Sequence, residues 1–295
     1  MEELQNTEPT SAALTYRAYA KINLSLEVLG KRPDGYHNLA TVMQTIGLYD
    51  QLHIAPAPDL EFDCNLPDLV EENNLVWRAA IQLFDKLPAH NKMGANIVLE
   101  KAIPVAGGLG GGSSDAASTL LALNDLWDLS LSQDELVEEA ARLGSDVPFF
   151  IYGGTMLAEG RGEELSQLPP LKPAWVVLLN PGLEMPFDKT SQLYQALCRS
   201  DYSDGSITLQ LVKSLQSAKH PSQSLLFNAF ERAAYERFPQ LDQFRGAMVE
   251  AGADYVRLSG SGPTLFTLLD DEMEASQIAT KLQANGLQAF AVKTV

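Results

Sequence analysis

The sequence predicts an α+β protein of two domains, and three observations support this prediction. An alternating apolar pattern near the N-terminus predicts strands, and apolar residues at helical spacing later in the first half predict helices. Three prolines, Pro169, Pro170 and Pro173, separate this half from a second apolar strand at 175–179. A chain of 295 residues is long enough for two medium domains, which we place at 1–165 and 166–295.

Composition limits the partners that the chain can have. The formal net charge is −17 at pH 7, and such a surface repels nucleic acid and anionic lipid, so we predict neither partner. No apolar run reaches membrane-spanning length, and residues 1–15 predict a loose polar tail. Cys64 and Cys198 are expected to be reduced. These features predict a cytoplasmic protein, or one of the plastid stroma after removal of a transit peptide. The expected state is a monomer or homodimer, and nothing in the sequence decides between the two.

The first predicted element is a strand at 15–28, where apolar residues alternate with polar ones. This alternation is typical of a strand buried on one face only. Because alternate side chains share a face, Lys21 and Asn23 would project from the same side, about 6 to 7 Å apart. Two polar side chains at that separation could serve one ligand.

A turn is predicted at 32–35, where proline fixes φ and glycine is free to take a left-handed conformation. Tyr36 and His37 leave this turn together. A further strand-like stretch at 41–46 then runs back along the first strand. The opening segment therefore predicts an antiparallel hairpin.

A glycine-rich loop at 104–114 is the most informative feature of the chain. It follows a predicted helix at 75–87 and an apolar strand at 97–99, and it runs into a helix that ends near Trp127. Its five glycines within six positions allow backbone conformations in which consecutive N–H groups point at one ligand. We therefore predict an anion-binding loop.

Ser113 and Ser114 stand where the following helix begins, so the positive end of its dipole faces the loop, and a di- or triphosphate is the expected occupant. The loop matches neither common glycine motif. A dinucleotide fingerprint requires a third glycine where Ser113 stands, and a Walker loop requires a lysine, which is absent between Lys101 and Lys172. A flexible linker is the alternative, but the flanking strand and helix disfavour it.

A helix at 132–143 follows, because its first residues form a capping box and its apolar residues recur at helical spacing. Gly144 is placed to end it. Pro148 biases Val147 toward an extended conformation. We therefore expect Asp146 to lie at a sharp corner between a helix and a strand.

The second half begins with the strand at 175–179. Its other predicted elements are helices at 190–197 and 228–238, a loop at 199–206, and two short strands at 255–258 and 264–268. Between these strands lies the sequence Ser-Gly-Ser-Gly-Pro at 259–263. Two interpretations remain open for it: a hairpin turn, or a backbone surface that a ligand can approach closely.

A phosphate-binding loop, a strand lysine and a fixed aspartate together indicate phosphoryl transfer. That reaction requires positioning, charge neutralisation and a group that orients or deprotonates the attacking hydroxyl. Each residue also has a plain structural interpretation. Taken singly, Lys21 is more often an exposed strand lysine and Asp146 a helix or turn cap.

Taken together, the segments resemble the superfamily of galactokinase, homoserine kinase, mevalonate kinase and phosphomevalonate kinase, the GHMP kinases. The central phosphate loop of this superfamily resembles residues 104–114, its C-terminal glycine motif resembles 259–263, and the segment with its catalytic aspartate resembles 144–149. The sequences Ala-Lys-Ile-Asn-Leu at 20–24 and Arg-Pro-Asp-Gly-Tyr-His at 32–37 extend the resemblance over most of the chain. It implies a two-domain fold, with a mixed sheet and helices in the N-terminal domain and an α/β sandwich in the C-terminal domain.

The resemblance implies an ATP-dependent small-molecule kinase that phosphorylates the C2 hydroxyl of a cytidine-diphosphate-linked methylerythritol. It makes Asp146 the general base and Lys21 the cation beside the hydroxyl and the migrating phosphoryl group. It places Asn23 beside the methylerythritol, and Tyr36 and His37 against the cytidine. The residues that it implies for ATP are Asn74 on the adenine side and the loop residues Pro104, Val105, Ala106, Gly107, Gly108, Leu109, Gly110, Gly111, Gly112, Ser113 and Ser114.

Magnesium is expected to arrive with ATP, and its protein ligands are left unassigned. Asp115 adjoins the loop, but a helix acid that complements the dipole is an equal interpretation. Two alternative functions remain: another GHMP kinase, acting on homoserine or mevalonate, or a non-catalytic ligand sensor on the same fold. A nucleotide-tailed substrate needs a base pocket, which the Tyr36–His37 segment would supply.

Overall fold

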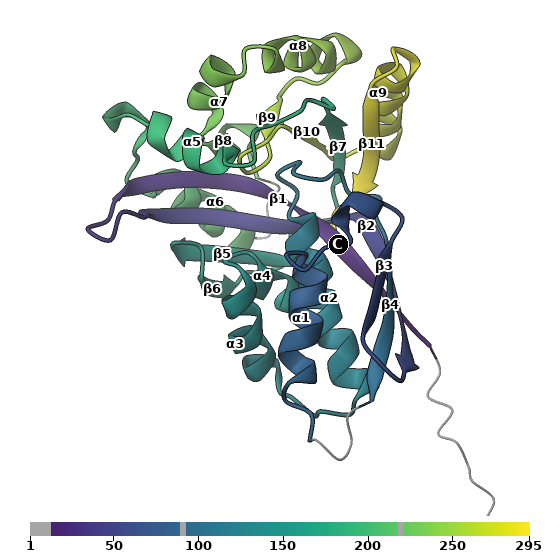
Figure 1. The fold of residues 1–295 in the computed structure, drawn as a ribbon. Helices are drawn as coiled ribbons and strands as arrows, with labels where there is room; N and C mark the ends of the chain where they lie inside the picture. The colour runs from purple at the N-terminus through teal and green to yellow at the C-terminus, as the bar shows by residue number, and fades with distance from the viewer. Residues whose placement is uncertain (1–12, 89–92, 218–220) are drawn as a thin grey trace, which may run out of the picture.

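The structure is a computed structural model that describes residues 13–88, 93–217 and 221–295. Two long strands, β1 (Leu14–Lys31) and β2 (His37–Ala57), run through the middle of the molecule, where a lower and an upper half meet (Figure 1). They pair antiparallel around a turn in which Gly35 has a φ of +89°. The predicted hairpin is confirmed, with strands longer than expected. Of the predicted N-terminal tail, residues 1–12 lie outside the described residues.

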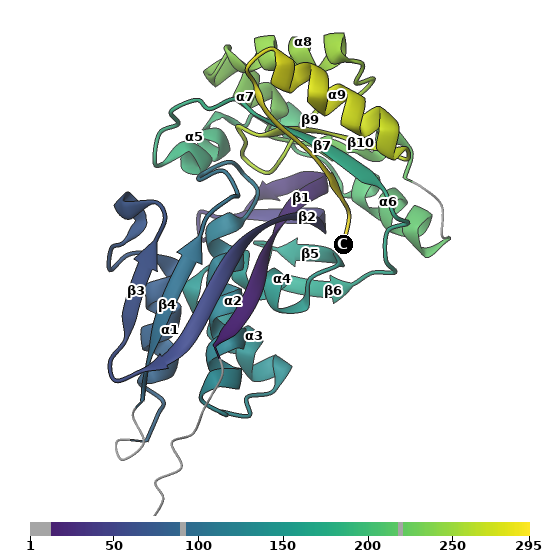
Figure 2. The same cartoon turned by 90° about the vertical axis from the view of Figure 1, so that its right-hand side faces the viewer.

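The sheet of the lower half has seven strands within the described residues, in the order β3-β4-β2-β1-β8, with β5 paired to β2 and β6 to β5. The remaining strands are β3 (Glu61–Cys64), β4 (Gly94–Glu100), β5 (Thr155–Gly160), β6 (Glu164–Gln167) and β8 (Phe227–Asn228). The helices of this half lie together on one side of β2 and β4 (Figure 2), and they are α1 (Leu75–Phe84), α2 (Gly111–Leu126), α3 (Gln133–Leu143) and α4 (Val147–Tyr152). Short 3-10 turns are η1 (Pro67–Leu69), η3 (Arg199–Asp201) and η4 (Gln223–Leu225).

The upper half is built on an antiparallel sheet, which has four strands among the described residues, in the order β11-β7-β10-β9. These strands are β7 (Trp175–Asn180), β9 (Arg257–Leu258), β10 (Leu265–Leu269) and β11 (Gln288–Lys293). The helices that follow β7 in the chain are α5 (Lys189–Ala196), α6 (Ser206–Gln216), α7 (Glu231–Arg237), α8 (Leu241–Ala251) and α9 (Glu272–Ala284). The predicted α+β class is thereby confirmed. None of the helices in the described residues has the length and apolar character needed to span a bilayer.

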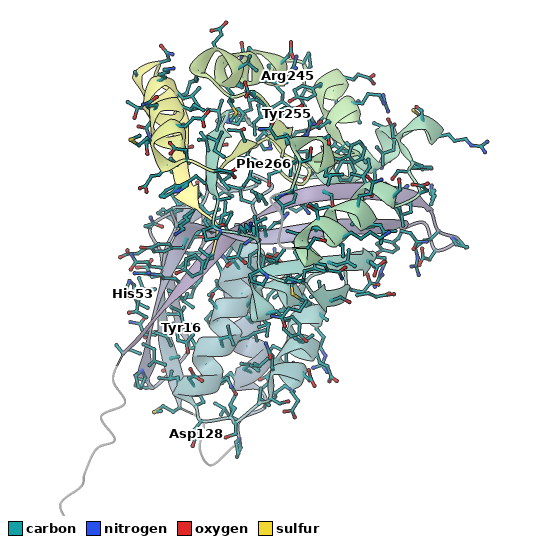
Figure 3. All side chains as sticks on the ribbon, turned by 180° about the vertical axis from the view of Figure 1, so that it is seen from behind. Tyr16, His53, Asp128, Arg245, Tyr255 and Phe266 are labelled. Atoms are coloured by element: carbon teal, nitrogen blue, oxygen red, sulfur yellow. The ribbon has the colours of Figure 1, made fainter. Side chains whose placement is uncertain are left out.

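The two halves share an apolar core along β1. Ile22 and Leu24, both completely buried, belong to the same cluster as Leu178 of β7 and Phe266 of β10. Figure 3 shows Phe266 at the level where the upper sheet approaches the long strands. Because apolar area is removed from water on both sides of this contact, the two sheets are held against each other by the hydrophobic effect.

The prediction that the first strand is buried on one face only is wrong. Lys21 and Asn23 are each only 4% exposed, and Ser25 and Glu27 are fully buried. The upper sheet shares an apolar cluster with Ile22 and Leu24. The helix α6 packs on β1 where Ser25 Oγ and Thr208 Oγ1 form a hydrogen bond and the Thr208 N–H donates to Glu27 Oε2. Alternation placed Lys21 and Asn23 on one face, but the register of β1 with β2 shifts between Asn23 and Ser25, so Leu26 joins them at the larger cleft. Nor could alternation show that the second half of the chain covers both faces.

Segments of the second half return to the first sheet. The strand β8 pairs parallel with β1, and α6 packs against β1 and β2. The division at 165/166 therefore separates two sheets along the chain, although parts of 166–295 lie on the first sheet. The domain boundary stays a prediction.

Most helices and strands that the sequence predicts are present. The helix predicted at 75–87 is α1, those at 190–197 and 228–238 are α5 and α7, and the capping box of Ser132 with Glu135 begins α3. The helices α6, α8 and α9 were not predicted. The predicted loop at 199–206 contains the turn η3.

Candidate active site

Lys21 and Asp146 form the centre of the candidate site. The Lys21 Nζ lies 3.9 Å from Asp146 Oδ2, and it donates a hydrogen bond of 2.7 Å to Asn23 Oδ1. Burial lowers the pKa of the Lys21 ammonium, and the Asp146 carboxylate opposes this shift. The side chain of Asp146 is 46% exposed. The site thus combines a buried cation with an accessible carboxylate.

The orientation of Asn23 is fixed by its second neighbour. Asn23 Nδ2 donates to Thr41 Oγ1 at 2.8 Å, and that hydroxyl donates to the Ser25 carbonyl at 2.5 Å. The Asn23 oxygen is therefore turned toward Lys21, as the shared face of β1 predicted. The interpretation of Lys21 as an exposed strand lysine is wrong.

The corner that contains Asp146 differs from the prediction. Residues 147–152 form the helix α4 rather than a strand, and Pro148 stands in its first turn. Proline is tolerated there because its missing N–H would have no partner within the helix. Asp146 occupies the N-cap position, but its side chain makes no capping hydrogen bond. Its carboxylate is therefore directed to the site rather than committed to the helix end.

The glycine loop closes over Lys21. The Lys21 N–H donates to the Leu109 carbonyl at 2.9 Å, and Lys21 Nζ donates to the Gly108 carbonyl at 3.2 Å. Gly108 and Gly110 have φ of +81° and +72°. A Cβ at Gly108 would lie 2.2 Å from the Ser259 carbonyl oxygen, and one at Gly110 would lie 2.6 Å from the Phe150 ring. Only glycine fits these two positions, for both conformational and steric reasons.

The helix α2 begins directly after this loop, with Gly110 as its N-cap, so Ser113 and Ser114 lie near its start as predicted. Asp128, two residues beyond the end of α2, lies at the bottom of the lower half in Figure 3. The N-terminus of α2 is therefore at the junction of the two halves. Its first N–H groups have no partner within the helix and can bind an anion there.

Two clefts meet at the glycine loop. The larger, of about 790 Å³, is lined by Lys21, Asn23 and Asp146 together with Tyr36 and His37. The smaller, of about 330 Å³, is lined by Asn74, Pro104 to Gly108, Gly110 to Ser113, and Asp115. Gly108 and Gly110 line both clefts. A molecule in each cleft would therefore meet the other at the loop, beside Lys21 and Asp146.

Aromatic side chains form one end of the larger cleft. His37 stacks on Tyr194 with ring centroids 4.8 Å apart and an interplanar angle of 15°, and Tyr202 lies beside the same imidazole. Burial and the charge of Lys31 lower the pKa of His37, so its neutral form is favoured. Tyr36 is 57% exposed, and the Arg161 guanidinium lies over its ring. These rings offer apolar faces with polar edges, which suits a heterocyclic base.

In the smaller cleft, Asn74 has a structural role. Its Oδ1 accepts from the Val76 N–H and its Nδ2 donates to the Leu69 carbonyl, so it caps the helix α1. The remaining Nδ2 hydrogen is available to a ligand, since an amide nitrogen has two donors.

A buried charge cluster lies behind the loop. Lys101 Nζ contacts Asp50 Oδ2 at 2.5 Å and Asp115 Oδ2 at 2.7 Å. Burial, opposed by Lys101 and reinforced by Asp50, raises the pKa of Asp115 to about 8. Asp115 is the fifth residue of α2, so it lies just beyond the first turn. The Lys101 ammonium therefore already occupies the position beside both carboxyl groups where a metal cation would bind.

The described residues therefore provide no evident set of protein ligands for magnesium. Across residues 13–88, 93–217 and 221–295, no group of three or more His, Cys, Asp or Glu side chains could hold a metal ion. The Asp50–Asp115 pair does not fit this role either, because the Lys101 ammonium already contacts both carboxyl groups. We assign no protein ligand to magnesium.

The second glycine motif, at 259–263, connects the paired strands β9 and β10, so it is a hairpin connection, and it also lies against the site. Ser259 Oγ donates to the Gly108 carbonyl at 3.0 Å, and Gly260 lines the larger cleft. Asn228 donates to the carbonyls of Leu258 and Gly260, both at 2.8 Å, and so fixes this motif. The interpretation as a hairpin turn is confirmed, and the close approach of a ligand to this backbone stays a prediction.

Several residues of the site could not be found from the sequence. Tyr194 and Tyr202 have no motif around them, and Lys189 begins an ordinary amphipathic helix. They reach the loop or His37 only because the second half of the chain packs on β1. The signal that could have indicated Lys189 is weak: it is one of few lysines in an acidic chain.

Comparison with known proteins identifies relatives over almost the whole chain. The model of the GHMP kinases N terminal domain matches residues 74–154, and that of the GHMP kinases C terminal domain matches 207–288. The chain is 45% identical over 282 residues to a protein of Dehalococcoides mccartyi named 4-diphosphocytidyl-2-C-methyl-D-erythritol kinase, covering 96% of this chain and 98% of that one. A protein of the same name from Syntrophotalea carbinolica is 40% identical, over 95% of this chain and 99% of that one.

A solved structure is also similar. The crystal structure of a 4-(cytidine 5'-diphospho)-2C-methyl-D-erythritol kinase superposes with a TM-score of 0.82 at 35% identity. The match covers 95% of this chain and 99% of that chain. Both halves and the packing between them are therefore shared with a protein of that name.

Proposed function

The chain belongs to the 4-diphosphocytidyl-2-C-methyl-D-erythritol kinases of the GHMP superfamily, and from this premise we propose how its site performs the reaction. The enzyme transfers the γ-phosphoryl group of ATP to the C2 hydroxyl of 4-diphosphocytidyl-2-C-methyl-D-erythritol, giving the 2-phosphate and ADP. This is a step of non-mevalonate isoprenoid precursor biosynthesis. The observation that supports it most is the meeting of two clefts at Gly108 and Gly110, beside Lys21 and Asp146.

Asp146 is the general base of the proposed mechanism. The C2 hydroxyl oxygen attacks the γ-phosphorus, the bond to the β,γ-bridging oxygen breaks, and ADP leaves. The hydroxyl proton passes to the Asp146 carboxylate, which is accessible and carries no capping bond. Lys21, whose Nζ lies 3.9 Å from Asp146 Oδ2, is the cation beside the hydroxyl and the migrating phosphoryl group.

The acceptor occupies the larger cleft. Its polyol end lies at Asn23, whose amide is oriented by Thr41, and its cytidine lies at the aromatic end. There Tyr36 stacks on the base, and His37, held by Tyr194, bonds the base edge. A cleft of about 790 Å³ is larger than homoserine or mevalonate requires.

ATP occupies the smaller cleft. Its phosphates lie along Pro104 to Ser114 at the start of α2, where backbone N–H groups are directed at the anion. Asn74 offers its remaining amide hydrogen to the adenine. Magnesium would arrive with ATP and would offset the negative charge of its phosphates. We further propose that the protein acts in the cytoplasm, as a monomer or homodimer, without nucleic acid or membrane partners.

ATP consumption by the purified protein with magnesium tests this proposal. The acceptors are the cytidylylated substrate, the same polyol phosphate without the cytidylyl group, mevalonate and homoserine. We expect turnover with the first alone, because only that substrate fills the aromatic end of the cleft. Turnover of mevalonate or homoserine would show that the protein has another GHMP kinase activity. Absence of turnover with every acceptor would favour the non-catalytic ligand sensor.

A further inference from the structure

Lys189 is a buried cation that the proposed mechanism does not use. It is the first residue of α5 and is only 5% exposed. Its Nζ donates to the Ala106 carbonyl at 2.9 Å and to the Gly262 carbonyl. These carbonyls belong to the two glycine loops, 104–114 and 259–263. One ammonium therefore joins loops that lie about 150 residues apart in the sequence.

The ammonium has no anionic partner among the described residues. No carboxylate of this part of the chain lies within 4.0 Å of Lys189 Nζ, whereas Lys21 and Lys101 both pair with aspartates. Burial and the neighbouring Lys21 charge lower the pKa of Lys189 to about 8. A buried charge without a counter-charge is costly, and carbonyl dipoles offset only part of this cost. Such an arrangement indicates an anion that arrives with a ligand.

We propose that Lys189 is a positioning residue for the polyphosphate of bound ATP. It holds the loop at 104–114 against the loop at 259–263, and it provides a positive charge that the ligand's phosphates balance. This inference rests on the proposed function, since it places ATP phosphates on the first loop.

Other contacts show why the two loops need such a link. Ser259 Oγ donates to the Gly108 carbonyl, and the Thr264 N–H donates to the Gly107 carbonyl at 3.2 Å. These are single hydrogen bonds between neutral groups, and each contributes only modestly to stability. The bonds from Lys189 are charge-assisted and stronger. A loop whose N–H groups must converge on one phosphate chain benefits from being held in place before the ligand binds.

The test is calorimetric binding of ATP and of adenosine to Lys189→Met, Lys189→Arg and the unchanged protein, after melting curves show that each is folded. Lys213→Met is the matched control, because it removes the same charge from an exposed position of α6. We expect Lys189→Met to weaken ATP binding at least tenfold and adenosine binding less than twofold. Lys189→Arg should keep ATP affinity within about threefold, and Lys213→Met should match the unchanged protein.

An equal loss for ATP and adenosine, or no loss for ATP, would overturn the proposal. If Lys189→Met does not fold, Lys189→Arg decides: retained ATP affinity supports the role of the charge, and lost ATP affinity in a folded protein overturns it. The binding measurement needs no acceptor. Failure of turnover with the cytidylylated substrate would therefore reject the proposed function and leave the role of Lys189 standing. Normal turnover together with unchanged ATP binding by Lys189→Met would instead reject the role of Lys189 and leave the proposed function standing.

Discussion

The two clefts that meet at Gly108 and Gly110 are lined by different kinds of chemical group. The larger is lined mainly by side chains, with Lys21, Asn23 and Asp146 at the loop and aromatic rings at the far end. The smaller is lined mostly by the backbone of the glycine loop and the start of α2. Side chains select a particular molecule by shape and hydrogen bonding, whereas backbone N–H groups bind any suitably placed phosphate. Substitutions should therefore affect the two clefts in separable ways.

The largest effect is expected at the point where the clefts meet. Asp146→Asn should lower kcat by about a thousandfold, since an amide cannot accept the hydroxyl proton, and positioned general bases contribute about 10² to 10⁴. ATP affinity should stay unchanged. Steady-state kinetics and calorimetry check both. Asp254→Asn, an exposed aspartate after α8, is the control. Turnover close to that of the unchanged enzyme would remove the assigned role.

Gly108→Ala tests the backbone shared by both clefts. The new methyl group would lie 2.2 Å from the Ser259 carbonyl oxygen, at a φ of +81°, so the loop has to move. We expect kcat/KM to fall about a hundredfold for both substrates. Gly182→Ala is the matched control, because Gly182 has a φ of +63° but nothing within 4 Å. If the two variants behave alike, conformational strain rather than the close contact explains the loss.

His37→Ala should affect the side-chain cleft alone. The variant lacks the ring that stacks on Tyr194 and, with it, the proposed hydrogen bond to the cytosine edge. We therefore expect the KM of the cytidylylated substrate to rise roughly tenfold. The KM of ATP should not change. His53→Ala, on β2 away from the site (Figure 3), is the control. A rise in the KM of ATP instead would contradict the separation of the clefts.

Thr41→Val should act through Asn23. The variant loses the hydroxyl that accepts from Asn23 Nδ2 and donates to the Ser25 carbonyl, so the amide is free to rotate away from Lys21. We expect kcat/KM to fall about fivefold, the value of one hydrogen bond. Thr41→Ser keeps the hydroxyl and should retain the activity. Equal loss in both variants would point to packing.

The smallest effect on activity is expected at Asp115, which lines the backbone-lined cleft and is buried beside Lys101, so its change is followed through stability. The folded-state pKa of Asp115 is raised to about 8, so the stability linked to its proton is full below the unfolded value and is lost as pH rises toward 8. Asp115→Asn cannot titrate. Relative to the unchanged protein, its melting temperature should therefore rise by a few degrees between pH 5 and pH 8. A difference that is constant over this range would contradict the raised pKa.

Local signals in the sequence predicted much of what was observed. The capping box of Ser132 and Glu135 begins α3 as expected, because its hydrogen bonds join residues three apart. The glycine loop likewise precedes a helix, and Lys21 and Asn23 share one face of β1. The corner at Asp146 was predicted wrongly, because proline also suits the first turn of a helix and the sequence does not show which alternative is used.

The sequence by itself determined the chemistry of the loop at 104–114, the hairpin and the positions of Lys21 and Asp146 in the chain, because these depend on nearest neighbours and on residue type. Only the tertiary structure decided that β1 is buried on both faces, that Tyr194 supports His37, and that Lys189 joins the two glycine loops. Those contacts arise when the second half packs its apolar sheet face on Ile22 and Leu24. The hydrophobic effect that buries this shared surface is non-directional. No local sequence pattern therefore predicts which distant side chains it brings together.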